Sequence, residues 1–216
     1  MRTLLFLILA GLTIFFRADA QTNAAPALSS QASAPTIETL VCIRHGEKPK
    51  GGLGQLTCRG LNRALALPDV LLGKFGKPEF VFAPNPTEKA DKNQFYYIRP
   101  LMTIEPTAIR CGLPVNTEFG FRQIKELETE LQQPKYQGAT VFIAWEHGLL
   151  DVFAKNLVKD NGGDETRVPS WPENDFDTIF LIKITHTTTG ESVVFTIDHE
   201  KLNNLSDDCP QPVDRN

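Results

Sequence analysis

Residues 41–48 read Val-Cys-Ile-Arg-His-Gly-Glu-Lys, and this stretch decides the fold. Its apolar residues, together with residues 38–40, predict a buried strand that ends where His45 and Gly46 interrupt the apolar run. In open α/β sheets, ligands bind in the crevice outside the carboxyl ends of the strands. We therefore expect Arg44 and His45 to project into a ligand-binding crevice.

Three later segments add matching features in sequence order. Residues 56–64 read Leu-Thr-Cys-Arg-Gly-Leu-Asn-Arg-Ala, residues 99–106 contain Arg99, and residues 141–148 include an apolar strand that ends before His147. Together with the Arg-His-Gly tripeptide, these segments resemble the histidine phosphatase superfamily, also called the phosphoglycerate-mutase-like family. The resemblance covers residues 39–150.

One segment departs from the pattern of that family. The second pocket arginine of the family usually follows a strand closely and sits beside a Ser-Pro pair. Here the pair is Ala83-Pro84, and a polar insert at residues 91–94 lengthens the gap to Arg99. The alternative for Arg99 is a plain salt-bridge role.

The resemblance implies a pocket for a phosphoryl group. Such a group carries negative charge on three oxygens, which guanidinium and imidazolium groups bind with fixed geometry. The matching positions are Arg44 and Arg99 for substrate binding and His147 as the second catalytic histidine. His45 would be the nucleophile that forms a phosphohistidine, from which water releases phosphate. The resemblance implies no metal and no cofactor, since the positive side chains supply the charge.

The leaving alcohol needs a proton, so a carboxylic acid with a raised pKa is expected at the border of the pocket. Glu146 is the first choice because it adjoins His147 at a strand end, and Glu118 and Glu47 are the alternatives. Glu146 could instead orient an imidazole or bind Arg63.

Alternating strand and helix patterns predict the architecture. Buried strands are expected at residues 39–43, 79–83, 140–145 and 178–184, a short strand at 113–116 and an edge strand at 192–197; helices are expected at 57–75, 121–131, 149–158 and around Arg99. This order predicts a three-layer α/β/α sandwich with a mostly parallel central sheet and an antiparallel edge hairpin. Thr57 is the expected N-cap of the first helix, which Pro68 should kink or break.

The chain has 216 residues, of which 41% are hydrophobic, and this suits one domain with a full core. Residues 1–20 combine a short apolar run with an Ala-Asp-Ala sequence, which predicts a secretory signal peptide and no stable membrane anchor after cleavage. An uncleaved anchor is the alternative. Residues 21–36 are polar and predict a flexible linker, and residues 37–216 form the predicted histidine-phosphatase-like domain.

Export would place the four cysteines in an oxidising compartment, where disulfides form. Cys42 lies within the predicted first strand and is expected to be a small buried apolar residue. A bridge that involves Cys209 is expected, with its partner left open. The cysteine spacing matches neither a zinc site nor a Cys-x-x-Cys redox motif.

The remaining charged and aromatic residues are interpreted as structural. Arg59 and Arg63 are expected on the face of the first helix, with Arg63 able to reach the rim of the pocket; His186 and His199 are expected at the surface, and Trp145 and Trp171 in the core or pocket wall.

A formal net charge of −4 without a Lys/Arg run argues against nucleic acid or an anionic membrane as the main partner. The predicted function is a metal-independent phosphomonoesterase, secreted or periplasmic, that acts on a phosphorylated small molecule or surface component. The alternative is a non-catalytic protein of the same fold that binds phosphate or a phosphorylated ligand. The substrate and the oligomeric state stay open.

Overall fold

A six-stranded sheet organises the chain in the computed structural model, which describes residues 34–90, 92 and 94–211. The strands are β1 (Thr36–Arg44), β2 (Phe80–Phe82), β3 (Lys89–Ala90), β4 (Phe95–Tyr96), β5 (Val115–Asn116), β6 (Thr140–Trp145), β7 (Thr178–Thr187) and β8 (Gly190–His199); the helices are α1 (Cys58–Phe75), α2 (Arg99–Cys111), α3 (Ile124–Leu131) and α4 (His147–Asp160), with 3-10 turns at Pro134–Tyr136 and Glu165–Arg167. The predicted signal peptide and most of the predicted linker lie outside the described residues. Strand β1 takes in the last residue of that linker.

The strand order in the main sheet is β5-β2-β6-β1-β7-β8. Strands β5, β2, β6 and β1 are parallel, whereas β7 runs antiparallel to β1 and β8 antiparallel to β7. The register places Arg44 beside Trp145, so β1 and β6 end at the same edge of the sheet. This arrangement confirms the predicted three-layer fold with its antiparallel edge hairpin.

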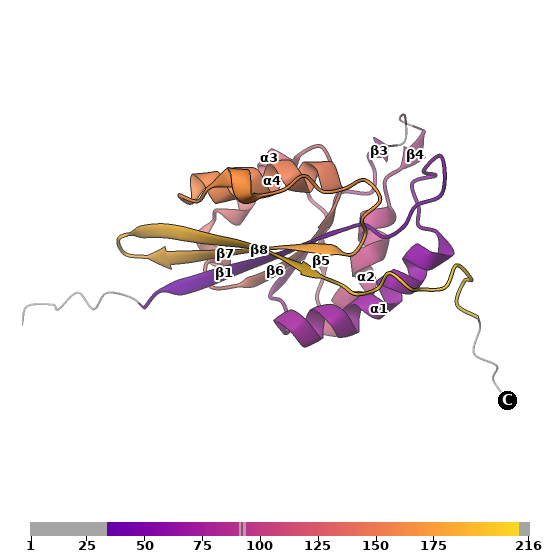
Figure 1. The fold of residues 1–216 in the computed structure, drawn as a ribbon, viewed down its shortest axis with the longest axis horizontal. Coiled ribbons are helices and arrows are strands. Elements are labelled where there is room, and N and C mark those ends of the chain that lie inside the picture. The colour runs from indigo at the N-terminus through magenta and orange to yellow at the C-terminus, as the bar shows by residue number, and fades with distance from the viewer. Residues whose placement is uncertain (1–33, 91, 93, 212–216) are drawn as a thin grey trace, which may run out of the picture. The chain divides into compact units, whose positions relative to one another are not determined.

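The helices cover the two faces of the sheet (Figure 1), with α1 and α2 on one side and α3 and α4 on the other. Because side chains alternate along a strand, β1 serves both layers. Val41 and Ile43 pack toward Leu67 of α1 and Ile104 of α2. Leu40 and Cys42 belong to the cluster on the α3 and α4 side. The burial of Cys42 confirms its prediction as an apolar core residue.

Two predicted helices differ from the structure in instructive ways. The side chain of Thr57 caps α1, accepting the Gly60 N–H at 3.1 Å as predicted, and the helix continues through Pro68 without a break. Helix α3 begins at Ile124, three residues later than predicted. The carbonyl of Phe121 instead accepts the indole N–H of Trp145 at 2.9 Å, which holds this turn against β6.

The tail that follows β8 lies along α1 (Figure 1). A disulfide joins Cys209 to Cys58 at the first residue of this helix, which confirms the bridge expected for Cys209 and names its partner. The side chain of Asn62 donates to the carbonyls of Ser206 and Asp208 at 3.0 and 2.8 Å. The tail therefore supports the start of α1, which packs against the loop after β1.

Arg63 was expected on the helix face but is fully buried. Its guanidinium donates to both carboxylate oxygens of Glu47, at 3.0 and 2.8 Å, and to the carboxylate of Glu200. The helix face that the sequence suggests as exposed is covered by the segment after β8, which no local pattern reveals. In the described part of the chain, no helix has the length and apolar character to cross a membrane.

Candidate active site

His45 follows the last residue of β1, and its backbone N–H donates to the carbonyl of Trp145 at 3.1 Å. The side chain is buried, with 2% exposed surface for the residue. Its Nδ1 lies 2.8 Å from the carbonyl oxygen of Gly46. A carbonyl only accepts, so Nδ1 carries the hydrogen and a neutral ring keeps its lone pair on Nε2.

Arg99 brings positive charge directly to this ring. Its Nε lies 3.2 Å from Nε2 of His45, and its guanidinium carbon lies 4.4 Å from the centre of the Tyr97 ring. Burial, and after it the charge of Arg99, lowers the pKa of His45 well below its usual value. His45 is therefore neutral at pH 7, and the structure brings together these two predicted site residues despite the long gap between them.

The loop that carries His45 is held on two sides. The backbone N–H of Gly46 donates to Oγ1 of Thr103 at 2.9 Å, and that hydroxyl donates to the carbonyl of Arg99 at 2.8 Å. On the other side, a Cβ at Gly46 would lie 3.1 Å from the Cα of Gly60 in α1. The close approach of the loop to α1 explains why glycine follows His45.

Arg44 is also buried, but its Nη1 points to backbone carbonyls. It donates to the carbonyl oxygens of Glu173 and Asp175, the latter at 2.9 Å, and the guanidinium carbon lies 4.0 Å from the centre of the Phe176 ring. The Nε of Arg44 is buried and has no hydrogen-bond partner among the described residues. This unpaired donor marks the position as one that an anionic ligand would stabilise.

Glu146 and His147 stand at the end of β6, at the same sheet edge as His45. One oxygen of Glu146 accepts the backbone N–H of Leu149 at 2.9 Å and caps α4, and the other lies 2.6 Å from Nδ1 of His147. The two side chains are partly exposed, at 26% and 21%. They are therefore more open to solvent than the buried His45 at the same edge of the sheet.

Glu146 does not have the raised pKa that was expected of it. Burial alone would raise the pKa, but the close approach of the His147 ring and the backbone N–H groups of Gly148 and Leu149 lower it to about 2. An ionised carboxylate cannot donate a proton at pH 7. The geometry fits the alternative, in which Glu146 orients the imidazole of His147.

The two alternative acids occupy different surroundings. Glu47 is held by Arg63 through both of its oxygens, so its place is in the buried ion pair under the loop. Glu118 is exposed, and its backbone N–H donates to the side chain of Asn116 at 2.9 Å. Neither residue has a described contact with His45.

Two aromatic residues near His45 were missed by the sequence reasoning. The ring centre of Tyr97 lies 6.0 Å from that of His45, and the ring centre of Phe176 lies 6.1 Å from it. The Tyr97 hydroxyl is buried without a hydrogen-bond partner among the described residues, and burial raises its pKa. No motif marks these residues, because they reach the site from the segment before α2 and from the loop before β7.

Comparisons with known proteins agree with this geometry at the level of fold. No protein-family model and no curated protein sequence matches the chain. Among solved structures, a candidate phosphohistidine phosphatase SixA from Nakamurella multipartitia matches with a TM-score of 0.52 and 16% identity, over 78% of this chain and 98% of that one. A mycobacterial glucosyl-3-phosphoglycerate phosphatase matches with a TM-score of 0.51 and 15% identity, over 74% and 97% of the two chains.

The chain thus shares its fold with these two structures. The Arg-His-Gly sequence stands at the end of β1 in this fold, with Arg99 against the histidine and His147 at the end of the neighbouring strand. Similarity at this level of identity concerns the fold and does not extend to activity.

Proposed function

We propose that the chain is an exported phosphomonoesterase that acts through a phosphohistidine at His45. The observation that carries this proposal is the neutral tautomer of His45. Its Nδ1 hydrogen is committed to the carbonyl of Gly46, and its Nε2 lone pair faces Arg99. A buried imidazole of this form is a nucleophile beside a group that binds phosphate oxygens.

The reaction proceeds in two displacements. Nε2 of His45 forms a bond to phosphorus while the bond to the leaving oxygen breaks, and the alkoxide takes a proton from solvent or from a group at the rim. Water then attacks the phosphohistidine, loses a proton, and releases inorganic phosphate and neutral His45. Arg44 and Arg99 neutralise the charge on the phosphoryl oxygens during both steps, and His147 donates a hydrogen bond to them.

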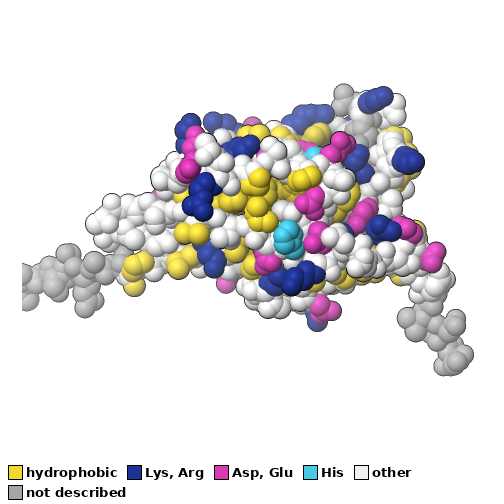
Figure 2. Space-filling model, viewed as in Figure 1, with side chains coloured by type: hydrophobic (Ala, Val, Ile, Leu, Met, Phe, Trp, Pro, Cys, Tyr) yellow, Lys and Arg dark blue, Asp and Glu magenta, His cyan; other side chains and the backbone are white. Residues whose placement is uncertain are grey.

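Export is part of the same proposal. The Cys58–Cys209 disulfide supports it, since such bridges persist in oxidising compartments, and it agrees with the predicted signal peptide. The proposed partner is a phosphorylated small molecule or surface component, and nucleic acid is not among the proposed partners. Figure 2 supports this choice, because positive and negative side chains are interspersed over the visible face and form no basic stripe.

The test is phosphate release by the purified protein, with chelator present and without added metal. The substrate set contains p-nitrophenyl phosphate, sugar phosphates, a phosphohistidine peptide and glucosyl-3-phosphoglycerate; the last two correspond to the names of the similar structures. We expect turnover that His45→Ala reduces at least about 1,000-fold, since the nucleophile itself is removed. The matched control is His199→Ala, whose side chain is 56% exposed.

Rapid acid-free quenching with radiolabelled substrate should trap a phosphorylated protein that is stable to base and labile to acid. The same label should be absent in His45→Ala. Folded protein that binds phosphate but turns over none of these substrates would refute the phosphatase and favour the non-catalytic binder. Turnover that survives in His45→Ala would refute the phosphohistidine.

A further inference from the structure

A cavity of about 300 Å³ lies at the opposite end of β1 from His45. Glu38 near the start of β1 forms part of its wall, and α3, α4, β7 and β8 supply the remainder. Glu38 lies seven positions before His45 along an extended segment, which corresponds to about 23 Å. The cavity is therefore separate from the proposed phosphatase site, and the inference drawn from it does not depend on that activity.

Glu38 is the deepest polar group of this cavity, with 1% of the residue exposed. Its Oε2 lies 3.2 Å from Nε2 of His186, while its Oε1 is buried and has no hydrogen-bond partner among the described residues. A buried carboxylate oxygen without a partner costs free energy that a ligand with donors would recover. Burial also raises the pKa of this carboxyl group to about 7, although the hydrogen bond and the charge of His186 act in the opposite direction.

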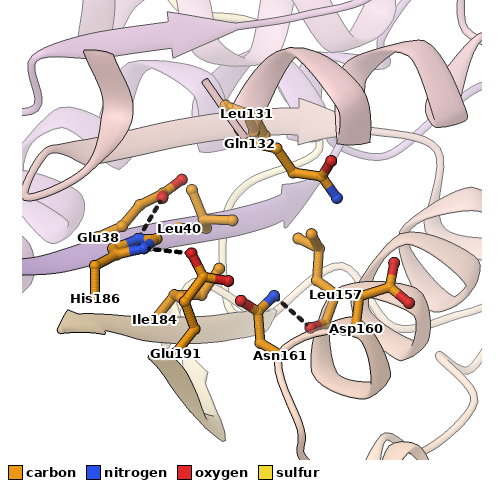
Figure 3. A pocket seen from close by; sticks show the side chains of 10 residues that line it. All are labelled: Glu38, Leu40, Leu131, Gln132, Leu157, Asp160, Asn161, Ile184, His186 and Glu191. Carbon is orange, nitrogen blue, oxygen red and sulfur yellow. Dashed lines mark hydrogen bonds and ion pairs between the residues drawn. The ribbon is translucent and has the colours of Figure 1, made fainter. Parts of the chain in front are cut away.

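Most of the other polar groups around the cavity are acceptors or are already paired, and Gln132 adds an amide that can donate as well as accept. Nδ1 of His186 is paired with Glu191 at 2.8 Å, so both ring nitrogens of this histidine are in use. His186 was expected at the surface and is instead largely covered. Asp160 lies on the opposite side of the cavity from the linked side chains of Glu38, His186 and Glu191 (Figure 3). Asn161 donates its amide to the carbonyl of Leu157 at 2.8 Å, which leaves its side-chain oxygen as an acceptor.

The walls between these acceptors are aliphatic. Leu40, Leu131, Leu157 and Ile184 line the cavity, and Figure 3 shows the first three with their side chains around the same hollow as Glu38. A volume of this size and an apolar lining with a few convergent polar groups are typical of small-molecule sites. The chemistry requires a ligand with positive charge, several donors and an aliphatic body.

We propose that this cavity binds a small organic cation, a primary ammonium group on a short aliphatic chain. The ammonium has donors for the open oxygen of Glu38, and the oxygen of Asn161 and the carboxylate of Asp160 are further acceptors in the lining of the cavity. The methylene groups lie against the leucine side chains. A metal ion fits less well, because the described residues contain no group of three or more His, Cys, Asp or Glu side chains placed to hold one.

The test is isothermal titration of the purified protein in a buffer without amines, with three probes of equal chain length. These are 1,5-diaminopentane, n-pentylamine and the neutral 1-pentanol, and calcium and magnesium chloride are titrated separately. We expect saturable one-site binding of at least one amine and no saturable binding of pentanol. The amine should also raise the melting temperature.

Glu38→Gln should weaken amine binding at least about tenfold, because it replaces the open carboxylate oxygen while keeping the shape of the side chain. Asp160→Asn is the second variant, and its exposed position makes loss of folding unexpected. The matched control is Glu126→Gln on the exposed side of α3, which should bind as the wild type does.

Three results would overturn the proposal. The first is no saturable binding of either amine, and the second is equal binding of pentanol. The third is amine binding that both Glu38→Gln and Asp160→Asn leave unchanged. If Glu38→Gln does not fold, then unchanged binding in Asp160→Asn alone counts against the ammonium site.

Discussion

Nε of Arg99 lies 3.2 Å from Nε2 of His45, and this Nε2 is the ring atom that carries the lone pair. Without ligand, the arginine thus donates to the atom that would attack phosphorus. A phosphoryl group that enters the site would accept the arginine's hydrogen bonds on its oxygens and leave the lone pair directed at phosphorus. In the proposed reaction, this one guanidinium would protect the nucleophile and bind the phosphoryl group, and its charge lowers the pKa of His45.

The first prediction concerns the planar geometry of Arg99. Arg99→Lys keeps the charge but loses the guanidinium plane, and Arg99→Ala loses both. We expect kcat/KM to fall about 100- to 1,000-fold in Arg99→Ala, which is typical of removing one donor from a charged transition state, and by a smaller factor in Arg99→Lys. Arg110→Lys in the same helix is the control, since Arg110 is half exposed and pairs with Asp69. Equal activity of wild type and Arg99→Ala would place Arg99 outside the chemistry.

The second prediction concerns the protonation of His45. Its pKa is lowered well below the usual value near 6.5, so its ring resonances should not titrate between pH 5.5 and 8. Removal of the Arg99 charge in Arg99→Ala should move the pKa upward. Nuclear magnetic resonance of protein with labelled histidine measures the pKa of His45 in the wild type and in Arg99→Ala. The His45 signal is assigned as the one that is missing from the spectrum of His45→Ala. A wild-type midpoint near 6.5 would contradict the prediction.

The same shift affects stability, and its sign follows from the lowered pKa. The unfolded chain takes up a proton at His45 near pH 6.5, whereas the folded chain does not. This residue therefore contributes stability above pH 6.5 that is lost as the pH falls from there toward the folded pKa. His45→Gln should reduce the acid sensitivity of the free energy of unfolding in that window, as denaturant titrations at pH 5 and 7 would measure.

The third prediction separates the two roles considered for Glu146. With a pKa of about 2, the carboxylate orients His147 and caps α4. We expect Glu146→Gln to cost about 1 kcal/mol of stability through the weaker cap, and about tenfold in kcat for every leaving group alike. If Glu146 were the proton donor, its loss would slow the hydrolysis of alkyl phosphates at least about 100-fold more than that of p-nitrophenyl phosphate. The control is Glu165→Gln, whose side chain is 41% exposed.

The fourth prediction concerns the Cys58–Cys209 disulfide, which closes a loop with a sequence separation of 151 residues. Chain-entropy arguments give a loss of up to about 5 kcal/mol when such a loop is opened. Reductant should therefore lower the melting temperature of the wild type. The Cys58→Ser, Cys209→Ser double variant should melt at the lower temperature with or without reductant. An unchanged melting temperature of the fully reduced wild type would show that the noncovalent contacts of the tail stabilise the fold without the disulfide.

Local sequence patterns predicted the helices and strands well, but they predicted less well which side chains contact each other. The Thr57 cap and the apolar runs of β1 and β6 depend on neighbours in sequence, and the structure has them where they were expected. Arg63 was expected on the face of the first helix, able to reach the pocket rim, and His186 at the surface; both are held by buried carboxylates from distant segments. Such partners depend on which strand lies beside which, and this is not encoded in a window of a few residues.

The sequence by itself determined that a strand ends on Arg44 and His45 and that a second strand ends before His147, because apolar periodicity and its interruption are local properties. Only the tertiary structure decided that Arg99 reaches His45 across a long insert and that Glu146 is ionised. The physical reason is that a pKa and an ion pair depend on burial and on distances in space. These are set by the packing of α2 and α4 against the sheet.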